Sequence, residues 1–175
     1  MFLDESGFML QPVVRRTWAP RGQTPILRQW DRRDRLSAIS ALTAAPRRRR
    51  FGLYWAVYRH NIRSPEVLRF LQALRRHLPH GFTLIWDRHR PHRATRVQTW
   101  LAKYAAPIRV EWLPAYAPDL NPAEHVWGHI KYGDLANFAP AALDQLEEAV
   151  VTSLAQKRTH RGLLASFFRA AGMEL

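Results

Sequence analysis

Three acidic side chains, Asp4, Asp87 and Glu124, stand where a folded chain could bring them together. Asp4 follows the apolar residues 1–3, and Asp87 follows the continuous apolar run 82–86, which is typical of a strand covered on both faces. Glu124 stands in the first turn of an expected helix. Clustered carboxylates repel one another unless a cation neutralises them, and Mg²⁺ prefers carboxylate oxygens and substrate phosphates. The three residues together therefore indicate a divalent-metal site.

Each of these carboxylates also has a purely structural interpretation. Asp4 could begin a turn at Ser6-Gly7, and Asp87 could cap the helix that follows it. Glu124 has the strongest alternative, because Asn121 at the N-cap and an acidic residue three positions later form a capping box. Taken singly, each alternative is at least as good as a catalytic role. The convergence of all three on one end of one sheet favours the metal site.

The hydrophobic pattern that must position these residues alternates strands with helices. Strands are expected at 1–3, 36–43, 51–58, 82–86 and 108–112. Helices are expected at 65–78, from about 92, from about 122 and at about 141–157, broken at Gly162 and followed by an apolar stripe at 163–168. Three antiparallel strands followed by two parallel crossovers predict an RNase H-like α/β fold, a mixed five-stranded sheet flanked by helices. Its first and fourth strands are neighbours, which would bring the two aspartates together.

The composition indicates a single globular domain with a basic surface. Lys and Arg number 27 against 14 Asp and Glu among 175 residues, a net charge of +13. Such a surface attracts polyanions, and the planar fork of arginine binds two phosphate oxygens at once. Arginine use in a GC-rich genome is the alternative explanation. The chain has no cysteine, which excludes a disulfide framework, and its apolar runs are too short to span a membrane. We expect a cytoplasmic, nucleoid-associated protein with DNA as its partner.

The motifs around the acidic residues resemble those of DDE transposases, in the mariner-like group of bacterial insertion sequences. The resemblance covers roughly residues 2–140. It is carried by Leu3-Asp4-Glu5-Ser6-Gly7-Phe8, by residues 17–25 (TWAPRGQTP), by Trp86-Asp87 with His92, and by residues 116–127 (YAPDLNPAEHVW) with Lys131. The last of these motifs is the most specific.

The resemblance implies that Asp4, Asp87 and Glu124 are the catalytic carboxylates of a DDE superfamily endonuclease. They would hold two Mg²⁺ or Mn²⁺ ions, with 36 residues between the second and third carboxylates. The expected reaction is transposition: nicking of insertion-sequence ends, then joining of the freed 3′-hydroxyls to target DNA. The expected partners are the terminal inverted repeats, the target DNA and a second copy in a homodimer.

The same resemblance implies roles for further residues. Arg88, His92, Asn121 and Lys131 would support the metal ligands or contact DNA. Arg88 departs from the family pattern, which usually has asparagine there, so a large cation would stand beside the metal site.

Two basic segments are further candidates for the DNA backbone. Arg47, Arg48, Arg49 and Arg50 form the expected tip of a hairpin, where a solvated turn and a phosphate contact are equally good interpretations. Trp18 and Arg21 are expected to form a structural clamp, and the resemblance adds them to the DNA-backbone candidates.

Two pairs of histidines raise the question of a zinc site. His89 and His92 flank the second aspartate, but their spacing fits no standard zinc pattern. His125 and His129 stand four residues apart, but the zinc-protease signature requires glutamate directly after the first histidine, where this chain has Val126. We therefore expect no zinc site here.

The domain organisation expected is one DDE catalytic domain over 1–175, with an RNase H-like core over about 1–140 and C-terminal helices over about 141–175. The family carries helix-turn-helix modules ahead of the first aspartate, and these are absent from the sequence. An upstream-encoded DNA-binding portion could supply them. The alternative function is that of a truncated, non-catalytic remnant that binds DNA through charge alone.

Overall fold

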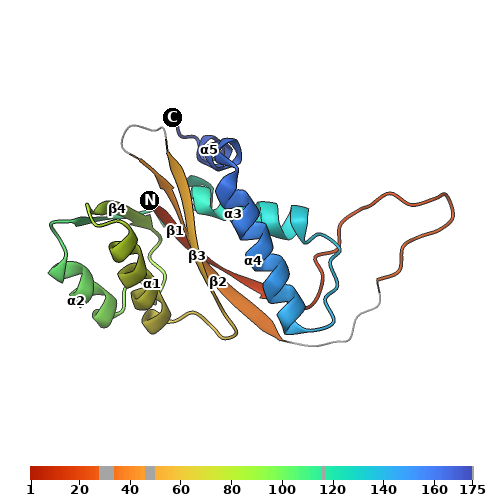
Figure 1. The fold of residues 1–175 in the computed structure, drawn as a ribbon, viewed down its shortest axis with the longest axis horizontal. Coiled ribbons are helices and arrows are strands. Elements are labelled where there is room, and N and C mark those ends of the chain that lie inside the picture. The colour runs from red at the N-terminus through yellow and green to blue at the C-terminus, as the bar shows by residue number, and fades with distance from the viewer. Residues whose placement is uncertain (28–33, 46–49, 116, 175) are drawn as a thin grey trace.

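A mixed five-stranded sheet with the order β3-β2-β1-β4-β5 forms the centre of the fold (Figure 1). The computed structural model describes residues 1–27, 34–45, 50–115 and 117–174. The strands are β1 (Phe2–Met9), β2 (Arg35–Ala44), β3 (Phe51–Tyr58), β4 (Phe82–Trp86) and β5 (Ile108–Trp112). The first three strands pair antiparallel, whereas β4 lies parallel to β1 and β5 parallel to β4. The predicted sheet is confirmed, including the adjacency of the first and fourth strands.

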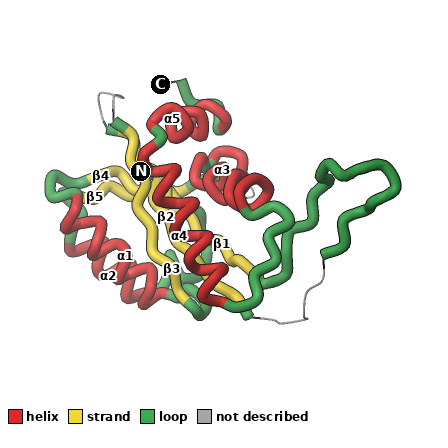
Figure 2. The backbone as a smooth tube through the Cα atoms, turned by 45° about the vertical axis from the view of Figure 1, so that its right-hand side comes forward, coloured by secondary structure: helices red, strands yellow, loops and turns green. Residues whose placement is uncertain are grey.

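Helices cover both faces of this sheet (Figures 1 and 2). They are α1 (Ser64–His77), α2 (Thr95–Lys103), α3 (Pro122–His129), α4 (Leu143–Thr159) and α5 (Arg161–Ala170). A 3₁₀ turn (Pro118–Leu120) precedes α3, and a π-helical turn (Ile130–Asp134) continues it. No helix in the described parts of the chain is long and apolar enough to cross a membrane.

Two apolar cores, one on each face, fix the sheet between the helices. Phe2 and Phe8 of β1 pack with residues of α3, α4 and α5, whereas Leu3 packs with residues of α1 and α2. Side chains alternate between faces along a strand. Asp4 is therefore turned toward α3, and Glu5 toward α1 and α2.

Three sequence-based boundaries are wrong. The expected turn at Ser6-Gly7 lies inside β1, because these residues pair with Ala38 and Ser37 of the long strand β2, and this tertiary pairing overrides the local turn preference. Helix α2 begins at Thr95 and not near residue 92, since 90–93 form turns. Gly162 does not break a helix: α4 and α5 meet at His160, and Gly162 lies in the first turn of α5.

A buried lysine ties α4 to the π-helical turn. Lys157 is only 4% exposed, and its ammonium donates to Asp134 and to the Ser153 hydroxyl, the latter at 3.2 Å. The Ser153 hydroxyl in turn donates to Asp134 Oδ2 at 2.5 Å. A buried charge of this kind is tolerated because it is paired and hydrogen-bonded. The cluster therefore anchors the end of the π-helical turn.

We predict that Lys157→Met lowers the free energy of unfolding by about 2 kcal/mol, because it leaves the partly buried Asp134 carboxylate without its cation. Urea denaturation followed by circular dichroism measures the change. Lys103→Met on the exposed face of α2 is the matched control and should change stability little. Equal stability of the two variants would contradict an anchoring role for Lys157.

Candidate active site

The side chain of Asn121 joins the start of α3 to β1. Its Oδ1 accepts from the Ala123 N–H at 3.1 Å, and its Nδ2 donates to the Leu3 carbonyl at 3.3 Å. Asn121 is only 3% exposed, and Pro122 follows it at the first helical position. The amide therefore links the turn that bears Glu124 to the residue immediately before Asp4.

The Glu124 carboxylate is not used as part of a capping box. The Asn121 N–H, which such a box would direct to Glu124, donates instead to the Pro118 carbonyl at 2.8 Å. Asn121 alone caps the helix. The capping interpretation is thus right for Asn121 and wrong for Glu124, whose exposed carboxylate is left to interact electrostatically with Asp4 and Asp87.

Asp87 follows β4 directly and is held by a buried histidine. His92 Nδ1 lies 2.8 Å from Asp87 Oδ1, and its Nε2 lies 2.8 Å from Glu5 Oε1. The imidazole has no exposed surface and stacks on the Trp86 ring with centroids 4.2 Å apart. Burial alone would lower the pKa of His92, but the hydrogen bonds to the two carboxylates outweigh it and raise that pKa to about 10. His92 is therefore an imidazolium that fixes the orientation of Asp87.

The environments of the three carboxylates differ strongly. Burial raises the pKa of Asp4 to about 8, and repulsion from Glu124, Glu5 and Asp87 adds to this effect. Partial desolvation also raises the pKa of Glu124, although this side chain keeps exposed surface, whereas the hydrogen bond from His92 lowers the pKa of Asp87. Asp4 Oδ2 is shielded from solvent and has no hydrogen-bond partner among the described residues. An unpaired buried carboxylate oxygen facing like charges is the environment that a divalent cation relieves.

Lys131 is a second cation near these carboxylates, on the side of Glu124 and Asp4. It lies in the π-helical turn, half-buried, with its ammonium 5.4 Å from the centre of the Phe8 ring. Burial lowers the pKa of Lys131, opposed by attraction from Glu124 and Asp4. Lys131 thus interacts electrostatically with Glu124 and Asp4, whereas Arg88 is exposed beside Asp87.

The remaining candidates for contact with the DNA backbone are either exposed or outside the described residues. Arg50 is exposed next to β3, and Arg47, Arg48 and Arg49 lie outside the described residues. Trp18 and Arg21 lie on the exposed arm 16–27, which projects from the body in Figure 1 beyond the hydrogen bonds that join Val13 and Arg15 to Asn137. The Trp18 side chain is fully exposed, so the expectation of a structural clamp is wrong.

Sequence reasoning missed Glu5 and Trp86 as parts of this site. Alternation along a strand was the available signal for Glu5, because the residue after Asp4 must face the opposite side of the sheet. Ligand atoms of Glu5, His89 and His92 lie within 4.8 Å of one another. Both nitrogens of His92 are already hydrogen-bonded, however, so His92 orients Asp87 and has no nitrogen left for a metal ion.

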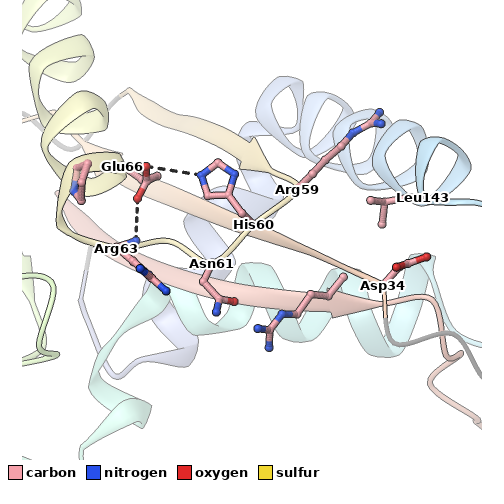
Figure 3. A pocket seen from close by; sticks show the side chains of 9 residues that line it. Asp34, Arg59, His60, Asn61, Arg63, Glu66 and Leu143 are labelled. Atoms are coloured by element: carbon pink, nitrogen blue, oxygen red, sulfur yellow. Dashed lines mark hydrogen bonds and ion pairs between the residues drawn. The ribbon is translucent and has the colours of Figure 1, made fainter.

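A pocket of about 640 Å³ at the opposite end of β1 has a different character (Figure 3). Its Arg59 forms ion pairs with Asp144 at 2.5 Å and with Glu147 at 2.7 Å. Its Glu66 accepts from the Arg63 N–H at 3.0 Å at the start of α1. These charges are paired within the fold, and none of the three acidic candidates lines the pocket.

Comparisons with known proteins agree with this architecture. The family described as DDE superfamily endonuclease matches residues 1–147. A search of curated protein sequences finds no match.

Among solved structures, the Mos1 transposase paired-end complex with left transposon end has a TM-score of 0.68 at 16% identity, over 98% of this chain and 50% of that one. The Mos1 mariner paired-end complex with Mn has a TM-score of 0.67 at 16% identity, over 98% and 51%. The catalytic domain of Mos1 mariner transposase has a TM-score of 0.60 at 14% identity, over 98% and 74%. The fold is therefore RNase H-like, and the chain spans about half the length of the transposases in these complexes.

We predict that Asp4 makes the stability of the metal-free protein pH-dependent. Its pKa is about 8 in the folded state against 3.8 ordinarily, so its protonated form stabilises the fold at low pH. This contribution is lost as pH rises toward 8. The melting temperature should therefore fall less between pH 5 and 8.5 in Asp4→Asn than in the unmodified chain.

Differential scanning fluorimetry measures this difference, with the exposed Asp119→Asn as control. Added Mg²⁺ at pH 8.5 should raise the melting temperature of the unmodified chain and of the control more than that of Asp4→Asn. Parallel pH profiles for all three proteins would refute the electrostatic description of Asp4.

Proposed function

Because the chain belongs to the DDE superfamily endonuclease family, we propose that it is the catalytic domain of an insertion-sequence transposase. It would nick the ends of the element and join the freed 3′-hydroxyls to target DNA. One observation carries the proposal: Asp4 and Asp87, on adjacent parallel strands, interact electrostatically with each other and with Glu124 at the start of α3. More specifically, we propose that this transposase belongs to the mariner-like group of bacterial insertion sequences.

The metal fits the donor set that the fold assembles. Asp4, Asp87 and Glu124 would hold two Mg²⁺ or Mn²⁺ ions, which supply charge stabilisation for an in-line displacement at phosphorus. His92 keeps Asp87 charged and oriented. Asn121 keeps the turn bearing Glu124 against β1.

The chain's own cations would hold the DNA. The ammonium of Lys131, beside Glu124 and Asp4, is placed to contact a phosphate of the strand being cut. Arg88, exposed next to Asp87, would add a second phosphate contact. Arg50, Trp18 and Arg21 would contact the DNA backbone further away, as would the remaining arginines of 47–50, and such contacts position DNA without reading its sequence.

The proposal also covers the assembly. The chain 1–175 would act as one catalytic domain within a homodimer that pairs two element ends. An upstream-encoded DNA-binding portion would recognise the terminal inverted repeats. The exposed arm 16–27 offers an extended surface for contacts with DNA or with the second copy.

We predict that the chain nicks supercoiled DNA carrying the flanking inverted repeats when Mg²⁺ or Mn²⁺ is added, and that Asp87→Asn reduces nicking to background. The substitution removes a proposed metal ligand while preserving the size of the side chain. Agarose-gel conversion of supercoiled to open-circular plasmid measures the rate. Glu148→Gln, on the exposed surface of α4, is the control and should nick normally. Retained nicking by Asp87→Asn would rule out the assigned triad.

Nicking, and not DNA binding, separates this function from that of a truncated, non-catalytic remnant. The +13 charge predicts that DNA affinity falls steeply with salt for the unmodified chain and for Asp87→Asn alike, as fluorescence anisotropy would show. Nicking should be tested with and without the product of the upstream reading frame. A chain that binds DNA in this way but never nicks, even with that product and either metal, is a remnant.

A further inference from the structure

Strand β3 forms one edge of the sheet, and its sequence has none of the features that usually protect an edge strand. It pairs with β2 on one side, and no strand among the described residues pairs with its other side. Its residues (FGLYWAVY) are all uncharged, and none is proline. Charges, proline or a bulge normally protect a long edge strand, because its unpaired backbone groups bind other strands. The open edge of β3 is therefore suited to pair with a further strand.

The register of β2 and β3 identifies the backbone groups that face the open side. The Ala45 N–H donates to the Arg50 carbonyl at 2.8 Å, and the same register continues without a bulge along both strands. In an antiparallel pair, alternate residues exchange hydrogen bonds with the neighbouring strand. The backbone groups of 52, 54, 56 and 58 therefore face β2, whereas those of 51, 53, 55 and 57 face the open side.

A groove of about 290 Å³ lies along this open side, between α1 and the end of α4 (Figure 2). Its α1 wall is apolar and is formed by Phe70, Ala73 and Leu74, and half-buried side chains of β3 form its floor. The side chains of an added strand would point alternately toward this wall and toward the opposite face of the sheet. The groove therefore accepts an apolar side chain at every second position of such a strand.

The opposite face of the sheet presents a cation to the same strand. Arg158, near the end of α4, lies over the Trp55 ring at 5.8 Å, is exposed and forms no ion pair with any described residue. On the α1 side, Arg69 is paired with Glu66 at 3.2 Å. The described lining of the groove contains neither aspartate nor glutamate. An added strand would thus favour acidic side chains on the Trp55 side.

Two other occupants fit this edge less well. Two β3 strands paired antiparallel about Trp55 would bring the Arg158 guanidiniums of two copies together, and each copy carries a net charge of +13. A DNA strand lacks the regular row of amide donors and acceptors with which an edge strand pairs. The backbone groups and the charge together favour a peptide.

We propose that the open edge of β3 binds an acidic peptide segment of another protein, which extends the sheet by one strand antiparallel to β3. The acidic side chains of this segment lie beside Trp55 and Arg158, and its apolar side chains enter the groove against α1. Backbone hydrogen bonds supply the affinity, and the alternating side chains supply the selectivity. None of Asp4, Asp87 and Glu124 lines the groove, so the inference does not depend on the proposed function.

The probe is a fluorescein-labelled peptide of eight residues that alternates glutamate with valine, and fluorescence anisotropy measures its binding to the full chain. Side chains of directly opposed residues point to the same face, so the glutamate N–H groups would face β3 and the valine N–H groups would face solvent. N-methylation of every glutamate should weaken binding at least about tenfold, because a row of backbone hydrogen bonds is lost, whereas N-methylation of every valine should weaken it little. Equal effects of the two methylated peptides, or no binding by the parent peptide, would overturn the inference.

A pair of protein variants tests the charge. Arg158→Met keeps an apolar stem beside Trp55 but removes the cation, and it should weaken binding of the parent peptide about threefold, as expected of an exposed ion pair. Arg96→Met removes the same charge from the exposed surface of α2, away from the groove, and should leave binding unchanged. Equal losses in the two variants would show that the peptide is attracted by net charge alone, which would overturn the inference.

Hydrogen exchange measured by mass spectrometry distinguishes the occupants. The parent peptide should slow exchange in residues 51–58 of the unmodified chain. If a higher protein concentration alone slowed exchange there, the edge would belong to a second copy. If an oligothymidylate strand slowed it and the peptide did not, the groove would belong to single-stranded DNA. Either of these last two results would contradict the assignment to a peptide.

Discussion

The amide of Asn121 is the contact on which the rest of the candidate site depends. Asp4 and Glu124 lie 120 residues apart in sequence, and the repulsion between their carboxylates opposes the packing of α3 on β1 that the apolar core provides. Asn121 adds a polar connection at the site itself, because its side chain caps α3 and donates to the strand carbonyl beside Asp4. Its burial excludes water from both hydrogen bonds and makes their loss costly. The neutral amide of Asn121 therefore helps to keep the carboxylates of Asp4 and Glu124 close together.

The acidic residues near Asn121 have different electrostatic environments. Asp87 is kept charged by an imidazolium that also holds Glu5, whereas Asp4 is buried with a raised pKa and an unpartnered oxygen. Asp87 is thus held in the charged form that a bound cation would require, whereas the environment of Asp4 is one that a cation would relieve. Trp86 and His92 form the rigid support for the first, and the adjoining strand forms the support for the second.

Much of this arrangement could be predicted from the sequence. The parts that could not be predicted have one physical cause in common. The sheet order follows from apolar runs and crossover rules, and the capping role of Asn121 follows from a local motif. The continuation of β1 through Ser6-Gly7 depends on pairing with β2, which local turn preference does not encode. The contact between Glu5 and His92 joins residues 87 positions apart on a buried face, and the free Glu124 carboxylate depends on where the Asn121 N–H goes. Local sequence patterns specify the helices and strands, whereas contacts between distant residues decide which polar groups become hydrogen-bond partners.

The position of α4 and α5 has a consequence for the boundaries of this domain as a folding unit. The stretch recognised by the family ends at residue 147, within α4. Yet Val150, Leu154 and Leu164, with Phe167 and Phe168, belong to the same apolar core as Phe2 and Phe8 of β1. A fragment trimmed to the recognised stretch would lose most of α4 and all of α5, and would leave the side of the sheet that carries Asp4 only partly covered, by α3. The stretch that matches the family is thus shorter than the set of residues that share this apolar core. A fragment made for biochemistry should therefore include all of α4 and α5.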